Sequence, residues 1–222
     1  MIKCKNLSLN YYEKEEMASL KNISIELPEK GIVGITGPSG SGKSSFLYAL
    51  AGLKRSVCTG EIIYNGKDYN GMSEKELINL RRLKFGFVFQ KHFLIPYLSV
   101  LDNTLVVKND YEDKEKAKKL LKKVALGDYI DRKPGCMSVG QCQRVAIVRA
   151  LMNNPDIIFA DEPTAALDAD SCKKVMELFK NEAKHSLILL VSHDEKIFQY
   201  FQKRIYFEEG KIVREENGIC NS

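Results

Sequence analysis

The eight residues 37–44, with the sequence GPSGSGKS, constrain the fold of this chain more than any other segment. A short apolar run at residues 31–36 precedes them and predicts a buried strand, and residues 45–50 follow with the pattern of a helix. A glycine turn between a strand and a helix is the setting of a phosphate-binding loop. Its glycines let backbone N–H groups converge on an anion, and the helix N-terminus adds its positive dipole end. We therefore predict that the chain binds a nucleoside triphosphate.

Two side chains at the end of this loop carry specific chemistry. Lys43 can reach the outer phosphates of a nucleotide, and the Ser44 hydroxyl can ligate Mg²⁺. The alternative is a glycine-rich turn that binds nothing, and the surrounding strand and helix argue against it. The residues that we expect to bind the nucleotide here are Gly37, Pro38, Ser39, Gly40, Ser41, Gly42, Lys43, Ser44 and Ser45.

Composition excludes several classes of protein. The 222 residues contain no apolar run near the roughly 20 residues of a membrane-spanning helix, and the N-terminus lacks the apolar region of a signal peptide. We therefore expect a soluble, cytoplasmic protein. In the most basic stretch, residues 114–123, lysines alternate with acidic and apolar residues, which predicts a solvated amphipathic helix and no nucleic-acid partner. The six cysteines form no CxxC pair, and we assign them no role.

Hydrophobic patterning predicts an α/β fold. Residues 1–9 and 20–27 alternate apolar and polar positions, as half-buried strands of an antiparallel edge sheet do. After the glycine loop, predicted strands alternate with predicted helices, an order that favours a mostly parallel sheet with right-handed crossovers. The remaining predicted elements are strands at residues 61–64, 85–89, 156–160 and 187–191, helices at 73–83 and 169–183, and a terminal hairpin of 203–208 with 211–214.

Residues 91–154 differ in character and predict an inserted group of helices. Ser99 with Asp102, and Ser138 with Gln141, have the spacing of residues that cap a helix N-terminus. We expect a single domain over residues 1–222. Residues 1–90 and 155–222 would form the α/β core with its antiparallel edge sheet, and residues 91–154 the helical subdomain.

Four polar side chains follow predicted strands at the end where open α/β sheets bind ligands. Asp161 and Glu162 follow one strand, His193 follows another and Gln90 follows a third. Asp161 is suited to hold Mg²⁺, directly or through water, and Glu162 to polarise an attacking water. His193 can hydrogen-bond a terminal phosphate or that water, and the Gln90 amide can meet the metal or the water. Taken alone, His193 is more often structural, and Gln90 carries almost no weight.

The order of these motifs resembles that of the nucleotide-binding subunit of ATP-binding-cassette (ABC) transporters over essentially the whole chain. Residues 81–90 and 94–96 are especially similar to the subgroup that serves lipoprotein release, macrolide and peptide export, antimicrobial-peptide resistance and cell division. The matching motifs are the P-loop at residues 37–44, the Q-loop at Gln90, the signature MSVGQ at 137–141, the Walker B strand 157–161 with Glu162, the D-loop at 165–168 and the switch His193.

The resemblance implies an ATPase of the P-loop, ABC-type fold that uses ATP and Mg²⁺. It implies that Glu162, His193 and Gln90 are catalytic, and that Ser44, Gln90 and Asp161 hold the metal. Tyr11 matches the aromatic residue that stacks on adenine, and Tyr12 is an adjacent alternative.

In the family, two copies pair head to tail, and the implied partner is therefore a second copy of this chain. Ser138, Gly140 and Gln141 of one copy would meet the γ-phosphate bound by the other, although Ser138 is equally suited to be an ordinary helix cap. A separate integral membrane permease is the second implied partner, and it would hold the protein at the cytoplasmic face of the cell membrane. The expected docking surface, hereafter the docking segment, comprises Gln90, His92, Phe93, Leu94, Pro96 and Tyr97, whose aromatic side chains are equally suited to core packing.

Three positions depart from the family pattern. Val139 stands where the family usually has glycine, and a β-branched residue there restricts the backbone and crowds the phosphate approach. Ala165 replaces a frequent serine, and Ser45 a common threonine. The stretch between Gln90 and Met137 is also short for the subgroup. We therefore expect slow ATP turnover by the isolated subunit.

Two other functions compete with a transporter ATPase. A soluble motor for DNA repair or translation would need coiled-coil insertions or a second cassette, and this chain shows neither. A regulatory cassette that signals through ATP-dependent dimerisation, with little hydrolysis, is kept open by Val139. Small-molecule kinases with a phosphate loop would not explain both the signature and His193.

Overall fold

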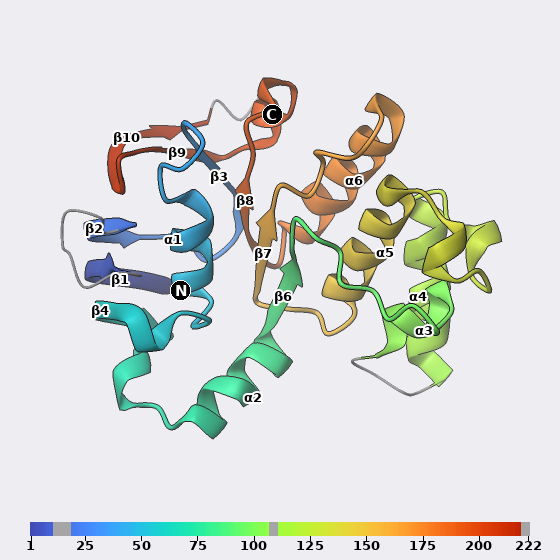
Figure 1. The fold of residues 1–222 in the computed structure, drawn as a ribbon, viewed down its shortest axis with the longest axis horizontal. Coiled ribbons are helices and arrows are strands. Elements are labelled where there is room, and N and C mark those ends of the chain that lie inside the picture. The colour runs from blue at the N-terminus through green and yellow to red at the C-terminus, as the bar shows by residue number, and fades with distance from the viewer. Residues whose placement is uncertain (11–18, 107–110, 219–222) are drawn as a thin grey trace.

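The main sheet has six strands in a computed structural model that describes residues 1–10, 19–106 and 111–218 (Figure 1). Its order is β10-β9-β3-β8-β7-β6. Neighbouring strands from β9 to β6 run parallel, and β10 pairs antiparallel with β9. The bounds are Gly31–Thr36 (β3), Phe85–Val88 (β6), Ile157–Asp161 (β7), Leu187–Val191 (β8), Lys203–Glu208 (β9) and Lys211–Asn217 (β10).

Both faces of this sheet are covered. Every residue of β3, β7 and β8 is buried, as parallel strands between two layers require. Successive side chains point to opposite faces, so Ile35 joins one hydrophobic cluster and Ile32 joins another. The first cluster lies between the two sheets, and the second lies under the helices on the opposite face.

A second sheet is antiparallel and confirms the expected edge sheet. It has the order β2-β1-β4-β5, with bounds Ile2–Leu9 (β1), Leu20–Glu26 (β2), Cys58–Tyr64 (β4) and Lys67–Asp68 (β5). Asn65 and Gly66 join β4 to β5, both with positive φ (48° and 81°), the conformation that a two-residue hairpin turn of this type requires.

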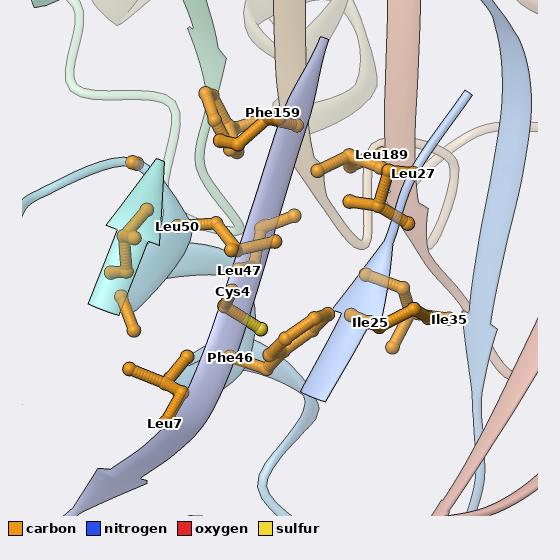
Figure 2. Packing of buried hydrophobic residues seen from close by; sticks show 14 of the residues in the cluster. Cys4, Leu7, Ile25, Leu27, Ile35, Phe46, Leu47, Leu50, Phe159 and Leu189 are labelled. Atoms are coloured by element: carbon orange, nitrogen blue, oxygen red, sulfur yellow. The ribbon is translucent and has the colours of Figure 1, made fainter. Parts of the chain in front are cut away.

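Helix α1, Lys43–Leu50, packs between the two sheets. Figure 2 shows Phe46 and Leu47 of this helix beside Cys4 of β1, and Leu50 of the helix and Ile35 of β3 belong to the same cluster. Burial from both sides fixes the helix, and therefore fixes the loop that precedes it.

The remaining helices lie mainly at the other end of the molecule (Figure 1). Figure 1 shows α3, α4 and α5 grouped beyond β6, with α6 beside them. Their grouping agrees with the expected helical insertion, although the division into subdomains stays a prediction. The bounds are Glu74–Lys84 (α2), Val100–Leu105 (α3), Tyr111–Lys123 (α4), Val139–Leu151 (α5) and Ala169–Glu182 (α6), with short 3-10 helices at Arg55–Val57, Tyr69–Gly71, Gly127–Tyr129, Pro134–Cys136 and Glu195–Tyr200.

The expected elements differ from the observed ones mainly at their ends. The predicted strand 85–89 stops at Val88, which forms the last pair with β7; the next carbonyl, that of Phe89, accepts a hydrogen bond from the Gln143 side chain (3.2 Å). The last strand continues three residues beyond the predicted 214, to Asn217, where Glu216 pairs with Arg204 across the hairpin. Within the described ranges, no helix is long and apolar enough to span a membrane.

Candidate active site

The loop between β3 and α1 has the backbone of a phosphate cradle. Gly37, Gly40 and Gly42 all have positive φ (136°, 77° and 101°), the region that favours glycine. A Cβ atom on Gly37 would lie 2.1 Å from the Phe207 carbonyl oxygen, so no larger residue fits there. Gly42 is the N-cap of α1, and no side chain caps this helix end. Its first N–H groups therefore remain available to an anion.

Lys43, the first residue of α1, turns its side chain back toward this loop. Its Nζ atom donates hydrogen bonds to the carbonyl oxygens of Gly37 (2.9 Å) and Pro38 (2.6 Å). Burial lowers the pKa of the Lys43 ammonium, and the nearby carboxylates of Glu162 and Asp161 act in the opposite direction. A cation thus stands between the loop and the two acidic residues.

The other serines in and after the loop differ in how far they are buried. The hydroxyl of Ser41 is buried and has no hydrogen-bond partner among the described residues. A buried donor without a partner is costly, and an oxygen-rich ligand in the loop would satisfy it. Ser45 is half-buried on the first turn of α1, while Pro38, Ser39 and Gly40 are exposed.

Asp161, at the end of β7, faces the first two turns of α1. Its carboxylate is buried and accepts hydrogen bonds at both oxygens. The Ser44 hydroxyl donates to Oδ1 over 2.9 Å, and the Tyr48 hydroxyl donates to Oδ2 over 2.6 Å. Sequence reasoning missed Tyr48, although its position four residues after Ser44 places both on one helix face.

Glu162 and His193 meet at adjoining strand ends. Asp161 pairs with Val191 in the sheet, so the residues after β7 and β8 leave the sheet side by side. The N–H of Glu162 donates to the Val191 carbonyl (3.0 Å), and Glu162 has a φ of +49°, which is strained for a residue with a side chain. Its Oε1 lies 3.0 Å from His193 Nδ1, with Glu162 mostly buried and the His193 side chain 75% exposed.

Gln90 lies at the same edge but is not joined to this group. It is exposed and follows β6, whose Val88 pairs with Ala160 of β7. Among the described residues, no hydrogen bond links the Gln90 side chain to Asp161, Glu162 or His193.

The signature residues lie apart from the loop of the same chain. Helix α5, which begins at Val139, packs in the second hydrophobic cluster, on the opposite face of the sheet from α1. Ser138 caps it: the Gln141 N–H donates to Ser138 Oγ (3.2 Å), and the Ser138 N–H donates to Gln141 Oε1 (2.9 Å). Ser138 is exposed, and so is Val139, at 63%. This capping box confirms the predicted helix start.

Gly140 is the signature residue that the fold itself requires. A Cβ atom there would lie 2.6 Å from the Ala166 carbonyl oxygen, so glycine lets α5 approach the D-loop residues 165–168. The predicted adenine contacts, Tyr11 and its alternative Tyr12, lie outside the described residues.

Comparison with known proteins shows which family the chain belongs to. The family model described as "ABC transporter" matches residues 20–165, which is more than half of the chain. The chain belongs to the ABC transporter family. It is an ABC-type, ATP-binding ATPase cassette, as the motifs indicate, and its relatives confirm the expected subgroup.

Three curated relatives of this ABC cassette illustrate its range. The uncharacterized ABC transporter ATP-binding protein MJ0796 of Methanocaldococcus jannaschii is 40% identical over 97% of both chains. The lipoprotein-releasing system ATP-binding protein LolD of Aquifex aeolicus is 42% identical over 88% of this chain and 90% of LolD. The putative hemin import ATP-binding protein HrtA of Staphylococcus haemolyticus is 38% identical over 87% of this chain and 90% of HrtA.

A solved structure confirms the fold class. The cassette superposes with a TM-score of 0.89 on a dimeric, post-hydrolysis state of MJ0796 bound to ADP and Pi, at 38% identity over 98% of both chains. A second dimeric structure of MJ0796 gives the same TM-score.

Proposed function

We propose that this ABC ATPase binds ATP with Mg²⁺ between two copies of itself and powers a separate membrane permease. The observation that carries the proposal is the separation of two complementary surfaces. The loop, Asp161, Glu162 and His193 gather at one edge of the sheet, and the exposed, Ser138-capped end of α5 belongs to the opposite layer. A second copy, facing the first, can bring such a helix end to the nucleotide.

The residues of the loop fit a triphosphate. Three glycines with positive φ, the uncapped start of α1 and the Lys43 ammonium offer donors and positive charge to phosphate oxygens. Lys43 would exchange its bonds to the Gly37 and Pro38 carbonyls for the outer phosphates. The buried, unpartnered hydroxyl of Ser41 is a further donor.

The residues also fit a magnesium ion. Ser44 Oγ and Asp161 Oδ1 lie 2.9 Å apart, and hydroxyl and carboxylate oxygens are the ligands that Mg²⁺ prefers. When bound, the ion would neutralise charge that develops on the phosphates. The Gln90 amide, at the same edge of the sheet, is the third proposed ligand.

Glu162 is placed to act on water. Its Oε1 is held by the exposed His193, which fixes the carboxylate beside Lys43 at the strand ends. A mostly buried carboxylate with one such partner is suited to accept a proton from an attacking water. His193 would then orient Glu162 and meet the terminal phosphate.

What we infer about the permease and the exported substance is based on the names of the relatives. LolD is named for a lipoprotein-releasing system and HrtA for putative hemin import, so the subgroup acts on varied cargo. We infer an exporter of the peptide, antibiotic or lipoprotein type, and a place on the cytoplasmic face of the membrane.

A mixing experiment tests the composite site. Lys43→Ala removes the loop cation and Ser138→Arg blocks the helix end, so each variant alone should lack ATPase activity. In a mixed dimer, one loop and one helix end remain intact at the same site, and ATPase activity should return.

A matched control for this experiment changes the same two residues, Lys43 and Ser138. Lys43→Ala mixed with the double variant Lys43→Ala/Ser138→Arg contains no intact loop and should stay inactive. The proposal is wrong if the first mixture also stays inactive and a Glu162→Gln protein remains monomeric in saturating Mg-ATP.

The exposed Val139 favours a second candidate function. A valine at the helix end favours a regulatory cassette that dimerises on ATP with little hydrolysis. Glu162→Gln separates the two functions, because a regulatory cassette would keep its output in a reconstituted complex and a transport motor would lose it.

A further inference from the structure

Tyr48 reaches the carboxylate that the proposed metal site depends on. It lies on α1 one turn after Ser44, and both hydroxyls donate to Asp161, Tyr48 to Oδ2 over 2.6 Å and Ser44 to Oδ1 over 2.9 Å. Asp161 is itself only 3% exposed. Oδ1 therefore lies beside Ser44, where the cation is proposed to bind, and Oδ2 is held by the phenol.

The Tyr48 ring is held in place by its neighbours. Its centroid lies 5.9 Å from that of Phe89, at a tilt of 52°, and Phe89 stacks on Phe87 at 5.7 Å. The ring also packs against the first hydrophobic cluster. Because the half-buried ring makes these contacts, the hydroxyl cannot move away from Asp161 without disturbing this packing.

A second partner matters because of how a carboxylate rotates. The terminal torsion of an aspartate is broad, so one hydrogen bond leaves the carboxylate plane loosely defined. Two bonds, one at each oxygen, define it. Short O–H···O⁻ bonds of this kind are also stronger than bonds between neutral groups. Partners that orient a ligand in this way typically change metal affinity by about 10- to 100-fold.

We propose that Tyr48 is a positioning residue that orients the Asp161 carboxylate toward the divalent cation of the nucleotide site. This inference rests on the proposed function, since it needs that cation to bind beside Ser44. The phenol itself does not touch the nucleotide. It acts through Asp161, and its ring is held by Phe89, the residue before Gln90.

Tyr48→Phe tests the proposal, because it removes the hydroxyl and keeps the ring. We expect the variant to bind Mn²⁺ about 10-fold more weakly in the presence of ADP, measured from the electron paramagnetic resonance of free Mn²⁺. Its affinity for ADP in EDTA should stay unchanged, because the loop is intact. A merely structural role would lower thermal stability and leave the Mn²⁺ affinity as it is.

Tyr64→Phe is a matched control. The Tyr64 hydroxyl donates to the carboxylate of Asp156, which lies just before β7, at the opposite end from Asp161. This variant loses the same kind of bond, so it should lose stability but keep its Mn²⁺ affinity. If Tyr48→Phe and Tyr64→Phe bind Mn²⁺ equally well in ADP, the inference about Tyr48 is wrong. If the wild-type protein itself does not bind Mn²⁺ with ADP, the proposed function fails first.

Discussion

Val139 is one of the three positions at which the sequence is expected to depart from the family pattern. The side chain is 63% exposed at the first position of α5, so it strains nothing within its own chain. In the proposed dimer, a cost would arise where the helix end meets the nucleotide held by the other copy. A β-branched side chain there narrows the approach to the backbone N–H groups that would bind phosphate.

We expect Val139→Gly to raise the steady-state ATPase rate by up to about tenfold, the factor that corresponds to roughly 1.4 kcal/mol of barrier. The measurement is phosphate release at saturating Mg-ATP. Val106→Gly makes the same change at another exposed valine, at the end of α3, and should leave the rate unaltered. An unchanged rate in Val139→Gly would show that the valine does not limit turnover.

At the scale of elements, two helices of this chain begin in the same way. Both α2 and α5 start with a complete capping box, formed by Ser73 with Glu76 and by Ser138 with Gln141. The first lies in a helix with no proposed role, and the second begins the signature helix. Mutating both serines therefore distinguishes two effects: the contribution of a cap to stability, which both helices share, and a contribution of the helix end to binding, which is proposed only for α5.

Ser73→Ala and Ser138→Ala should each lower the free energy of unfolding by about 1 kcal/mol, the usual cost of losing an N-cap side chain. Urea denaturation measures this loss. Only Ser138→Ala should also weaken ATP-dependent dimerisation, measured by light scattering with Glu162→Gln as the background. Equal dimerisation in both variants would show that Ser138 acts only as a helix cap.

At the scale of the whole molecule, the docking segment lies between the α/β core and the helical group. Phe93 and Tyr97 are 58% and 72% exposed, whereas Leu94 packs against the second hydrophobic cluster. Arg149 of α5 donates to the Phe93 and His92 carbonyls (both 2.8 Å) and holds the segment in place. A groove of about 410 Å³ adjoins it, lined by Leu53, Ile78, Arg81, Arg82, Phe85, Gly86, Phe87, Phe89, Arg149, Ala150 and Asn153.

Phe93→Asp or Tyr97→Asp should abolish co-purification with the permease and leave the fold unchanged, because both side chains are largely exposed. Thermal unfolding checks the fold, and Val213→Asp, an exposed position on β10, is the control. If both docking variants still bind the permease, the permease binds another surface of the protein.

Much of this architecture follows from local sequence. The strand–loop–helix order around residues 37–44 and the helix starts capped by Ser99 and Ser138 depend on neighbours within a few positions, and they appear as expected. The glycines, the apolar runs and the polar residues after each strand carry that information in their own types and spacing.

Contacts between distant segments were decided by the tertiary structure alone. Parallel pairing of β7 with β8 brings Glu162 to His193, and packing of α1 against β7 brings Tyr48 to Asp161, a partner 113 positions away. Spacing along the chain cannot reveal such pairs, because they depend on which strands adjoin and how far a helix is rotated. Strand order likewise brings Gln90 to this edge of the sheet after β6, while among the described residues no hydrogen bond joins its side chain to Asp161, Glu162 or His193.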